Sequence, residues 1–332
     1  MKTPGILILT RRDVSELLSL EEAIVAVEEA FRMHAENQAL TPDLLHVDSQ
    51  DGEFHIKVGG LKQEKTYFGL KANAGFFQNM QRYGLPNIQG VILLFDGDKG
   101  SPLALMDSID ITILRTGAAT AVAAKYLARP DSKTATICGC GKQGQIQLRS
   151  LQQVLPNLER VFAFDVDQHQ VDLYTSKMSS ELGIAVTQAE TLENSASRSD
   201  VIVTCTPSQK HFLEKAHVRP GTFIAAIGAD SPDKQELEPD LLVGNKVVVD
   251  ILDQCARVGE LHHALDAGLV TQQDVYGELG DIIGGNIPGR TSGGEITIFD
   301  ATGTALQDVA AAVVVYEKAL NQKVGTLVDL YA

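Results

Sequence analysis

A glycine-rich segment near the middle of the chain constrains the fold more than any other feature. Residues 139–144 read GCGKQG and fit the pattern G-x-G-x-x-G. An apolar, β-branched run over residues 134–138 precedes the segment, and a helix-like stretch from Gln143 to about Val154 follows it. A strand, a glycine turn and a helix in this order form the phosphate-binding element of dinucleotide-binding folds. The alternative is a glycine turn with a purely structural role.

The positions within this segment have separate tasks. Gly139 permits the tight turn, Gly141 lets the backbone approach a pyrophosphate, and Gly144 lets the helix pack closely on the strand. Lys142 and Gln143 open the helix, whose free N–H groups and partial positive charge favour phosphate. We therefore predict that these five residues bind the cofactor.

An acidic residue ends the next predicted strand. The run RVFAFD finishes at Asp165, which lies 21 positions after Gly144. A carboxylate here accepts hydrogen bonds from the ribose hydroxyls and repels a 2′-phosphate. No arginine stands among the residues that follow directly, VDQH. The cofactor predicted from this pattern is NAD rather than NADP.

The rest of the chain divides by its pattern into two parts. Ser19 and Glu22 have the spacing of a capping box and predict a helix through Phe31. Alternating apolar segments predict a mixed sheet over residues 41–107, and an alanine-rich helix is expected from about Arg115 to Ala128. From residue 134, strands alternate with helices, which is typical of a parallel sheet. The predicted strands are TATICG (134–139), RVFAFD (160–165), DVIVTCT (200–206), TFIAAIGAD (222–230), KVVVDIL (246–252) and ITIFD (296–300).

A last apolar helix is expected over about residues 304–321 and returns to the first part. The predicted fold class is α/β, with a Rossmann dinucleotide-binding domain inserted into a second, α+β domain. The predicted domains are residues 1–118 with 304–332, and residues 119–303.

Composition excludes several partners. The formal net charge is −15, which argues against nucleic acid and anionic membranes, since both require a basic face. No apolar stretch is long enough to span a bilayer, and the N-terminus lacks the apolar core of a signal peptide. The four cysteines are interpreted as small, reduced, buried side chains of a cytoplasmic protein, and their spacing fits no zinc site. No metal is therefore predicted.

Several blocks in the same order resemble the ornithine cyclodeaminase/mu-crystallin family. They are FGLKANAG, GVILLFDGDKGSPLALMDS, LRTGAATAVAAKYLARP, ICGCGKQGQIQL, GADSPDKQELEPDLL, QCARVGELHHAL and ITIFDATGTALQD. The resemblance implies a homodimer in which the first domain serves substrate binding and dimerisation and the inserted domain binds NAD(H). It implies chemistry at the α-carbon of an amino or imino acid, and the small-molecule substrate is of that class.

The resemblance also implies roles for individual side chains. Lys71 matches the family's active-site lysine, and Arg115 matches its substrate-carboxylate arginine, which recognises a carboxylate through two parallel hydrogen bonds. Thr116 either bonds the cofactor or caps the helix. Asp230 matches an aspartate that transfers the proton of the substrate nitrogen.

Further cofactor contacts are expected where two strands end. Thr204 and Thr206 in TCTPS flank the nicotinamide ribose, and Gly228 lies at the neighbouring strand end. Residues 299–303 match a family block that closes over the nicotinamide. His262 and His263 match another block, without an assigned role.

One position departs from the family. Members often carry a second carboxylate-binding arginine in the strand after the first long helix, and this segment reads TPDLLHVDSQ. Lys57 is the best replacement by charge, ahead of His46 and His55, and the departure puts ornithine specificity in doubt.

Three functions follow from the resemblance. The first is an NAD-dependent imino acid reductase or amino acid dehydrogenase, with Lys71, Arg115 and Asp230 as catalytic residues and Lys57, Lys71 and Arg115 on the substrate. The second is an ornithine cyclodeaminase, a lyase that forms proline and ammonia with no net change in NAD. The third is a crystallin-like binder without turnover, against which the retained proton carrier Asp230 argues.

Overall fold

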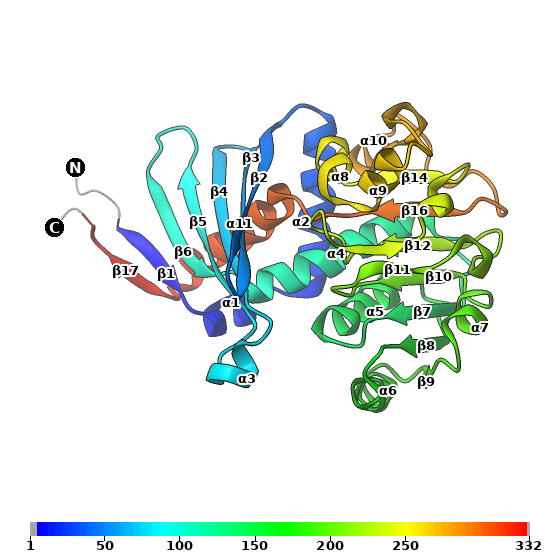
Figure 1. The fold of residues 1–332 in the computed structure, drawn as a ribbon. Coiled ribbons are helices and arrows are strands. Elements are labelled where there is room, and N and C mark those ends of the chain that lie inside the picture. Colours follow the sequence, from blue (N-terminus) through cyan, green and yellow to red (C-terminus); the bar gives the residue numbers. More distant parts are fainter. Residues whose placement is uncertain (1–4, 331–332) are drawn as a thin grey trace. The chain divides into compact units, whose positions relative to one another are not determined.

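The computed structural model describes residues 5–330, which form two compact units (Figure 1). Unit 1 comprises the chain up to Arg115 together with the residues from Thr304 onward, and unit 2 comprises Thr116–Gly303. The division falls inside helix α4 (Ile109–Leu127), three residues before the predicted boundary. The α/β fold with a separate Rossmann-type sheet is as predicted.

Unit 1 is built on a seven-stranded mixed sheet in the order β17-β1-β6-β5-β4-β3-β2. Its strands are β1 (Ile6–Leu9), β2 (Ala39–Ser49), β3 (Gly52–Lys62), β4 (Thr66–Gly75), β5 (Ile88–Asp96), β6 (Pro102–Asp107) and β17 (Thr326–Val328). Strands β2 to β6 pair antiparallel with their neighbours, whereas β1 pairs parallel with β6. Strand β1 lies in the short N-terminal apolar run, for which we predicted no strand.

Helix α11 (Ala305–Gln322) covers one face of this sheet, where it contacts β3, β4 and β5 (Figure 1). It packs also on α2 (Leu20–Ala35). The capping box at the start of α2 is confirmed, since Ser19 Oγ accepts a hydrogen bond from Glu22 N and Ser19 N donates to the Glu22 carboxylate. The remaining helices of unit 1 are α1 (Arg11–Leu17) and α3 (Asn79–Tyr83).

Helix α4 begins at Ile109, six residues before the predicted start. Arg115 and Thr116 therefore lie inside the helix, and the interpretation of Thr116 as its N-cap and of Arg115 as an N-terminal arginine was wrong. Residues 109–114, IDITIL, directly precede Arg115 and are rich in β-branched side chains. Such residues favour a strand unless tertiary contacts select a helix.

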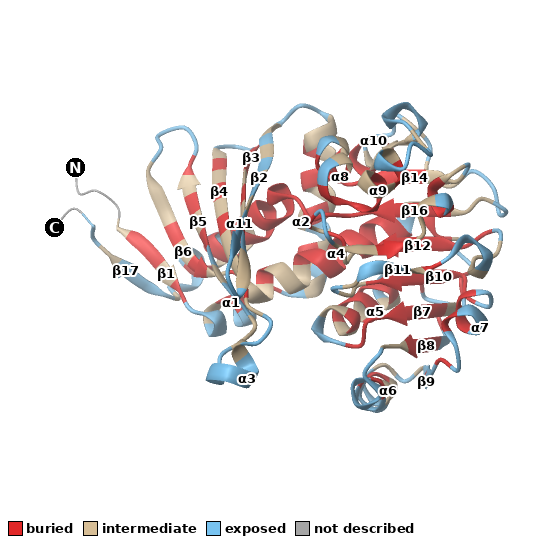
Figure 2. Cartoon of the chain, viewed as in Figure 1, coloured by how far each residue is buried: buried red, intermediate tan, exposed pale blue. Residues whose placement is uncertain are grey.

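Unit 2 has an eight-stranded parallel sheet in the order β15-β14-β16-β12-β10-β7-β8-β9. Its strands are β7 (Thr134–Cys138), β8 (Arg160–Phe164), β9 (Ala185–Gln188), β10 (Val201–Thr204), β12 (Phe223–Ala226), β14 (Lys246–Val249), β15 (Gly277–Glu278) and β16 (Thr297–Asp300). All six predicted strands are present, and each is shorter than predicted. Strands β10 and β12 are buried along their whole length (Figure 2), as continuous apolar runs in a parallel sheet require.

The helices and a small second sheet complete unit 2. The α-helices are α5 (Lys142–Val154), α6 (Gln168–Leu182), α7 (Leu192–Ala196), α8 (Leu252–Val258), α9 (Glu260–Asp266) and α10 (Leu279–Ile283). Strands β11 (Gln209–Leu213) and β13 (Gln235–Leu237) form the small sheet, and three 3-10 turns are η1 (Lys215–His217), η2 (Pro239–Leu242) and η3 (Gln272–Asp274).

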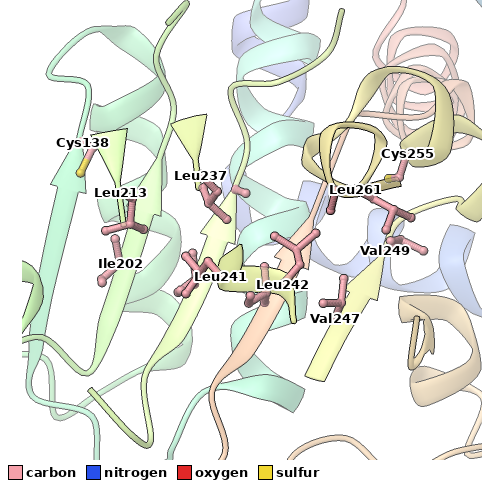
Figure 3. Close-up of a cluster of buried hydrophobic side chains, with 14 of the residues drawn as sticks. Cys138, Ile202, Leu213, Leu237, Leu241, Leu242, Val247, Val249, Cys255 and Leu261 are labelled. Atoms are coloured by element: carbon pink, nitrogen blue, oxygen red, sulfur yellow. The ribbon is translucent and has the colours of Figure 1, made fainter. Parts of the chain in front are cut away.

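A hydrophobic cluster joins these elements to the main sheet (Figure 3). Ile202 and Val249 contribute from the parallel strands, Leu213 and Leu237 from the small sheet. Leu261 of α9 completes this side of the cluster.

The four cysteines are free thiols, and three of them, Cys138, Cys140 and Cys255, are buried as predicted. Cys205 is half-buried. No helix within residues 5–330 is both long enough and apolar enough to cross a lipid bilayer.

Candidate active site

The glycine turn between β7 and α5 has the geometry that the motif predicts. Gly139 adopts a φ of +106°, which a residue with a side chain rarely adopts. A Cβ on Gly144 would lie 2.0 Å from the carbonyl oxygen of Gly139, so only glycine allows the helix to pack this closely. A Cβ on Gly141 would meet no atom within 4 Å. The three glycines thus serve a turn, a packing contact and an open approach to the backbone.

The N-terminus of α5 is prepared for an anion. Gly141 is its N-cap and provides no side-chain cap, and no acidic residue lies in the first turn. The first N–H groups of a helix have no partner within the helix, and the helix dipole places partial positive charge there. Lys142 is exposed and Gln143 is half-buried at this end. These residues fit the pyrophosphate of a dinucleotide.

Asp165 directly follows β8, the strand adjacent to β7. Its Oδ2 accepts a hydrogen bond of 2.7 Å from Cys140 N, and its Oδ1 accepts one of 3.0 Å from Asp167 N. Two backbone donors therefore fix the carboxylate beside the glycine turn. Each oxygen keeps a further lone pair that can accept a ribose hydroxyl.

The ends of β10 and β12 are tied together by Glu236, which the sequence analysis missed. The buried Glu236 carboxylate accepts hydrogen bonds from Thr206 N and Oγ at 2.6 and 2.7 Å, and from Gly228 N at 2.9 Å. Burial raises the pKa of Glu236. The hydrogen bonds that its carboxylate accepts act in the opposite direction but do not cancel this rise. Thr204 is fully buried at the end of β10. The N–H groups of Thr206 and Gly228 are engaged by the protein itself.

Asp230 lies in the loop after β12, four residues beyond the strand end. Its carboxylate contacts Lys234 Nζ at 2.6 Å. His263 fixes the same loop, because its Nε2 lies 2.8 Å from the carbonyl oxygen of Lys234. The contact with Lys234 was not predicted. The two imidazole rings of His262 and His263 pack on each other.

Residues 299–303 are held by buried carboxylates. Asp300, at the end of β16, accepts hydrogen bonds from Glu260 N and Leu261 N at the start of α9. Burial raises the pKa of Asp300 to about 7. Asp250 accepts a hydrogen bond of 2.7 Å from Gly303 N. The conformation of this block is thus determined inside unit 2.

Unit 1 contains a buried cluster of charged side chains, which we call the cationic cluster: Lys57, Lys71, Arg115 and Asp308. Lys57 and Lys71 are cross-strand partners on β3 and β4 and are each 3% exposed. Asp308, in the first turn of α11, lies 2.7 Å from Lys71 Nζ and 3.0 Å from Arg115 Nε. Arg115 also donates to Gln307 Oε1 at 2.8 Å. The structure therefore brings Lys57, Lys71 and Arg115 together.

Burial and neighbouring charge set the protonation of this cluster. Burial, with the positive charges of Arg115 and Lys57, lowers the pKa of Lys71 to about 7, although Asp308 opposes the shift. Burial also acts to raise the pKa of Asp308, but Lys71 and Arg115 outweigh it and lower that pKa. Lys71 can therefore gain or lose a proton near neutral pH beside a permanently charged guanidinium.

The sequence analysis missed Asp308 and Gln307. The available signal was an aspartate in the first turn of an otherwise apolar helix, ALQDVAAAVVV. Acidic residues are common in a first turn because they interact favourably with the helix dipole, so this signal alone does not indicate an active site.

The chain is similar to known enzymes over nearly its whole length. A model of the ornithine cyclodeaminase/mu-crystallin family matches residues 6–323. An alanine dehydrogenase of Archaeoglobus fulgidus is 41% identical over 325 residues, which cover 98% of each chain. An archaeal alanine dehydrogenase dimer with bound NAD superposes with a TM-score of 0.93 at 40% identity, over 98% of this chain and 100% of that one.

A second solved structure is a Δ1-pyrroline-2-carboxylate reductase of Thermococcus litoralis in complex with NADH and L-proline. It superposes with a TM-score of 0.92 at 32% identity, over 97% of this chain and 100% of that chain. Together with the predicted motifs, these similarities establish that the chain belongs to the ornithine cyclodeaminase/mu-crystallin family.

Proposed function

We propose that this chain is an NAD(H)-dependent oxidoreductase that interconverts an imino acid and the corresponding L-amino acid. The observation that carries the proposal is the cationic cluster, in which the buried side chains of Lys57, Lys71 and Arg115 gather around the single carboxylate of Asp308. Burying charges is costly unless they are compensated. A substrate carboxylate suits such a cluster, and Arg115 suits the carboxylate because a guanidinium forms two parallel hydrogen bonds.

The side chains supply proton transfer and orientation. When bound, NADH supplies the hydride that reduces the imine carbon, and the imine nitrogen must keep or gain a proton. We assign this proton transfer to Asp230, whose carboxylate contacts Lys234 Nζ at 2.6 Å. Protonated Lys71 is a cation and pairs with the substrate carboxylate. Because the pKa of Lys71 is lowered to about 7, Lys71 loses this positive charge as the pH rises through that value.

The cofactor-binding residues of the proposal lie in unit 2. Gly141 and the open N-terminus of α5 hold the pyrophosphate, and Asp165 accepts the adenosine ribose hydroxyls. The relatives that bind NAD or NADH support the same choice of cofactor. Thr204, Thr206 and Gly228 remain candidates for the nicotinamide side, although Glu236 engages the amides of Thr206 and Gly228 and Thr204 is fully buried.

The test is NADH oxidation with a panel of substrates. We would supply pyruvate with ammonia first, because of the alanine dehydrogenase relative, and then cyclic pyrroline and piperideine carboxylates. Ornithine with catalytic NAD⁺ and ammonia detection completes the panel. Net oxidation of NADH by one imino acid supports the proposal. Ammonia and proline from ornithine without net NADH change would make the chain a cyclodeaminase, and binding without turnover would make it a binder.

We also propose that unit 1 forms a homodimer through the sheet face opposite α11. A Cβ on Gly59 or Gly69 would touch α11, so the alternate residues of β3 and β4 point the other way. On that outer face Leu45, Val47 and Phe54 are 56, 44 and 41% exposed. Apolar faces of this kind are typical of interfaces, and the archaeal relative is a dimer.

Light scattering on the purified protein tests the dimer. The double variant Val47→Asp and Phe54→Asp should elute as a monomer where the wild type elutes as a dimer. A wild-type monomer at micromolar concentration would contradict the proposal.

The free cysteines agree with the further proposal of a cytoplasmic location, where thiols stay reduced.

A further inference from the structure

Two histidines and a glutamate form a compact group at the edge of the unit 1 sheet. His46 on β2 and His55 on β3 are directly opposed partners in the antiparallel register. Glu53 precedes His55 by two residues on β3, so all three side chains extend from the same face of the sheet. One ligand atom of each residue lies within 4.8 Å of those of the other two.

The distances within this group are close to those between the ligands of one metal ion. The Nε2 atoms of His55 and His46 lie 3.2 and 3.8 Å from the two oxygens of Glu53. The second distance is too long for a hydrogen bond. Ligands at 2.0–2.1 Å from a tetrahedral ion are separated by about 3.3 Å from each other. Both imidazoles thus direct a nitrogen toward one carboxylate at nearly the spacing of a coordination sphere.

The surroundings of the group also favour coordination. The side chains of His55, Glu53 and His46 are 11, 18 and 24% exposed, so their positions are restricted by packing. The two rings meet edge to face with centroids 4.6 Å apart, which leaves both Nε2 atoms beside Glu53. Asp48, which is 89% exposed, lies 2.9 Å from His46 Nε2 and can move to complete the sphere.

We propose that His46, Glu53 and His55 bind a divalent transition-metal ion, with Zn²⁺ as the ion of choice. Two imidazoles and one carboxylate are a common zinc donor set, whereas Mg²⁺ and Ca²⁺ prefer oxygen ligands. Water or Asp48 supplies the fourth ligand. The ion links the edge strand β2 to β3 and clamps this hairpin. The expectation that the chain holds no metal rested on cysteine spacing, and this site contains no cysteine.

The experiment is a Zn²⁺ titration of the full-length, untagged protein after removal of metals with a chelator. Isothermal titration calorimetry measures stoichiometry and affinity, and Co²⁺ absorption reports a tetrahedral nitrogen–oxygen environment. The assay contains no nucleotide and no substrate, so its outcome is independent of the proposed oxidoreductase activity. The variants are His46→Ala and Glu53→Gln, and His211→Ala replaces an exposed histidine of β11 as the matched control.

We expect one Zn²⁺ per chain, a tetrahedral Co²⁺ spectrum, and an affinity loss of about tenfold or more in both variants. The control should bind as the wild type does. Absence of Zn²⁺ binding by the wild type, or unchanged binding by Glu53→Gln, would overturn the proposal. Circular dichroism checks folding, and Glu53→Gln keeps the test valid where His46→Ala does not fold, because it preserves side-chain size.

Discussion

The dinucleotide turn of unit 2 and the cationic cluster of unit 1 are built in opposite ways. The turn takes its properties from three glycines within six consecutive residues, with Asp165 added after the next strand. The cluster takes Lys57, Lys71 and Arg115 from three elements, and Asp308 is 237 positions from Lys71. The turn works through exposed backbone groups, and the cluster through buried charges. A local site is therefore robust to the rest of the fold, whereas a non-local one depends on it.

The largest effect is expected at the cluster. Lys71→Met removes a buried lysine that we propose to hold the substrate carboxylate, and kcat/KM should fall by about 10²–10³-fold. Steady-state NADH oxidation with the identified substrate measures this. Lys65→Met, at an exposed position of the same sheet region, serves as the matched control and should retain activity. Activity of Lys71→Met close to that of the wild type would remove Lys71 from the site.

Alanine substitutions at two glycines of the turn should affect helix packing and cofactor binding separately. Gly144→Ala places a Cβ 2.0 Å from the carbonyl oxygen of Gly139, so the turn must shift. The free energy of unfolding should therefore fall by about 1–3 kcal/mol. Gly141→Ala meets open space and should keep the melting temperature while weakening NADH affinity. Differential scanning fluorimetry and NADH fluorescence titration measure the two quantities.

Gly293→Ala, also in open space, is the control and should change neither quantity. Equal melting temperatures for Gly144→Ala and Gly141→Ala would contradict the assignment of Gly144 to packing.

The pH profile tests the charge balance of the cluster. The pKa of Lys71 is lowered to about 7, so the cation is present below this pH and is lost as pH rises through it. The kcat/KM for imine reduction should therefore fall about tenfold per pH unit above this value. Lys71→Arg should remove this decline, because a guanidinium stays protonated. Asp308→Asn should move the decline to lower pH, since Asp308 raises the pKa of Lys71. A flat wild-type profile between pH 6 and 9 would contradict this assignment.

The smallest effect is expected at Asp165. Asp165→Ser removes the charge that repels a 2′-phosphate, and the preference for NADH over NADPH should fall by about tenfold. The ratio of kcat/KM values for the two cofactors measures this. Asp167→Ser, two positions on, is the nearby control, although it also caps α6. An unchanged ratio in Asp165→Ser would show that another group selects the cofactor.

The outcome of the sequence predictions follows the same contrast. The strand–turn–helix around Gly139 was predicted because each glycine's task depends on neighbours a few residues away. The capping box at Ser19 and Glu22 was predicted for the same reason. The start of α4 was predicted six residues late, since the β-branched residues before Arg115 favour a strand until tertiary packing selects a helix.

The sequence by itself determined the Rossmann-type unit, and it predicted Asp165 as the ribose ligand and, through resemblance, Lys71 and Arg115 as site residues. Only the tertiary structure decided that Asp308 pairs with both cations and that Glu236 ties two strand ends together. The hairpin register likewise decided that His46, Glu53 and His55 meet. The physical reason is that glycine conformation and helix caps are local properties. The pairing of buried charges instead depends on which distant segments share one low-dielectric interior.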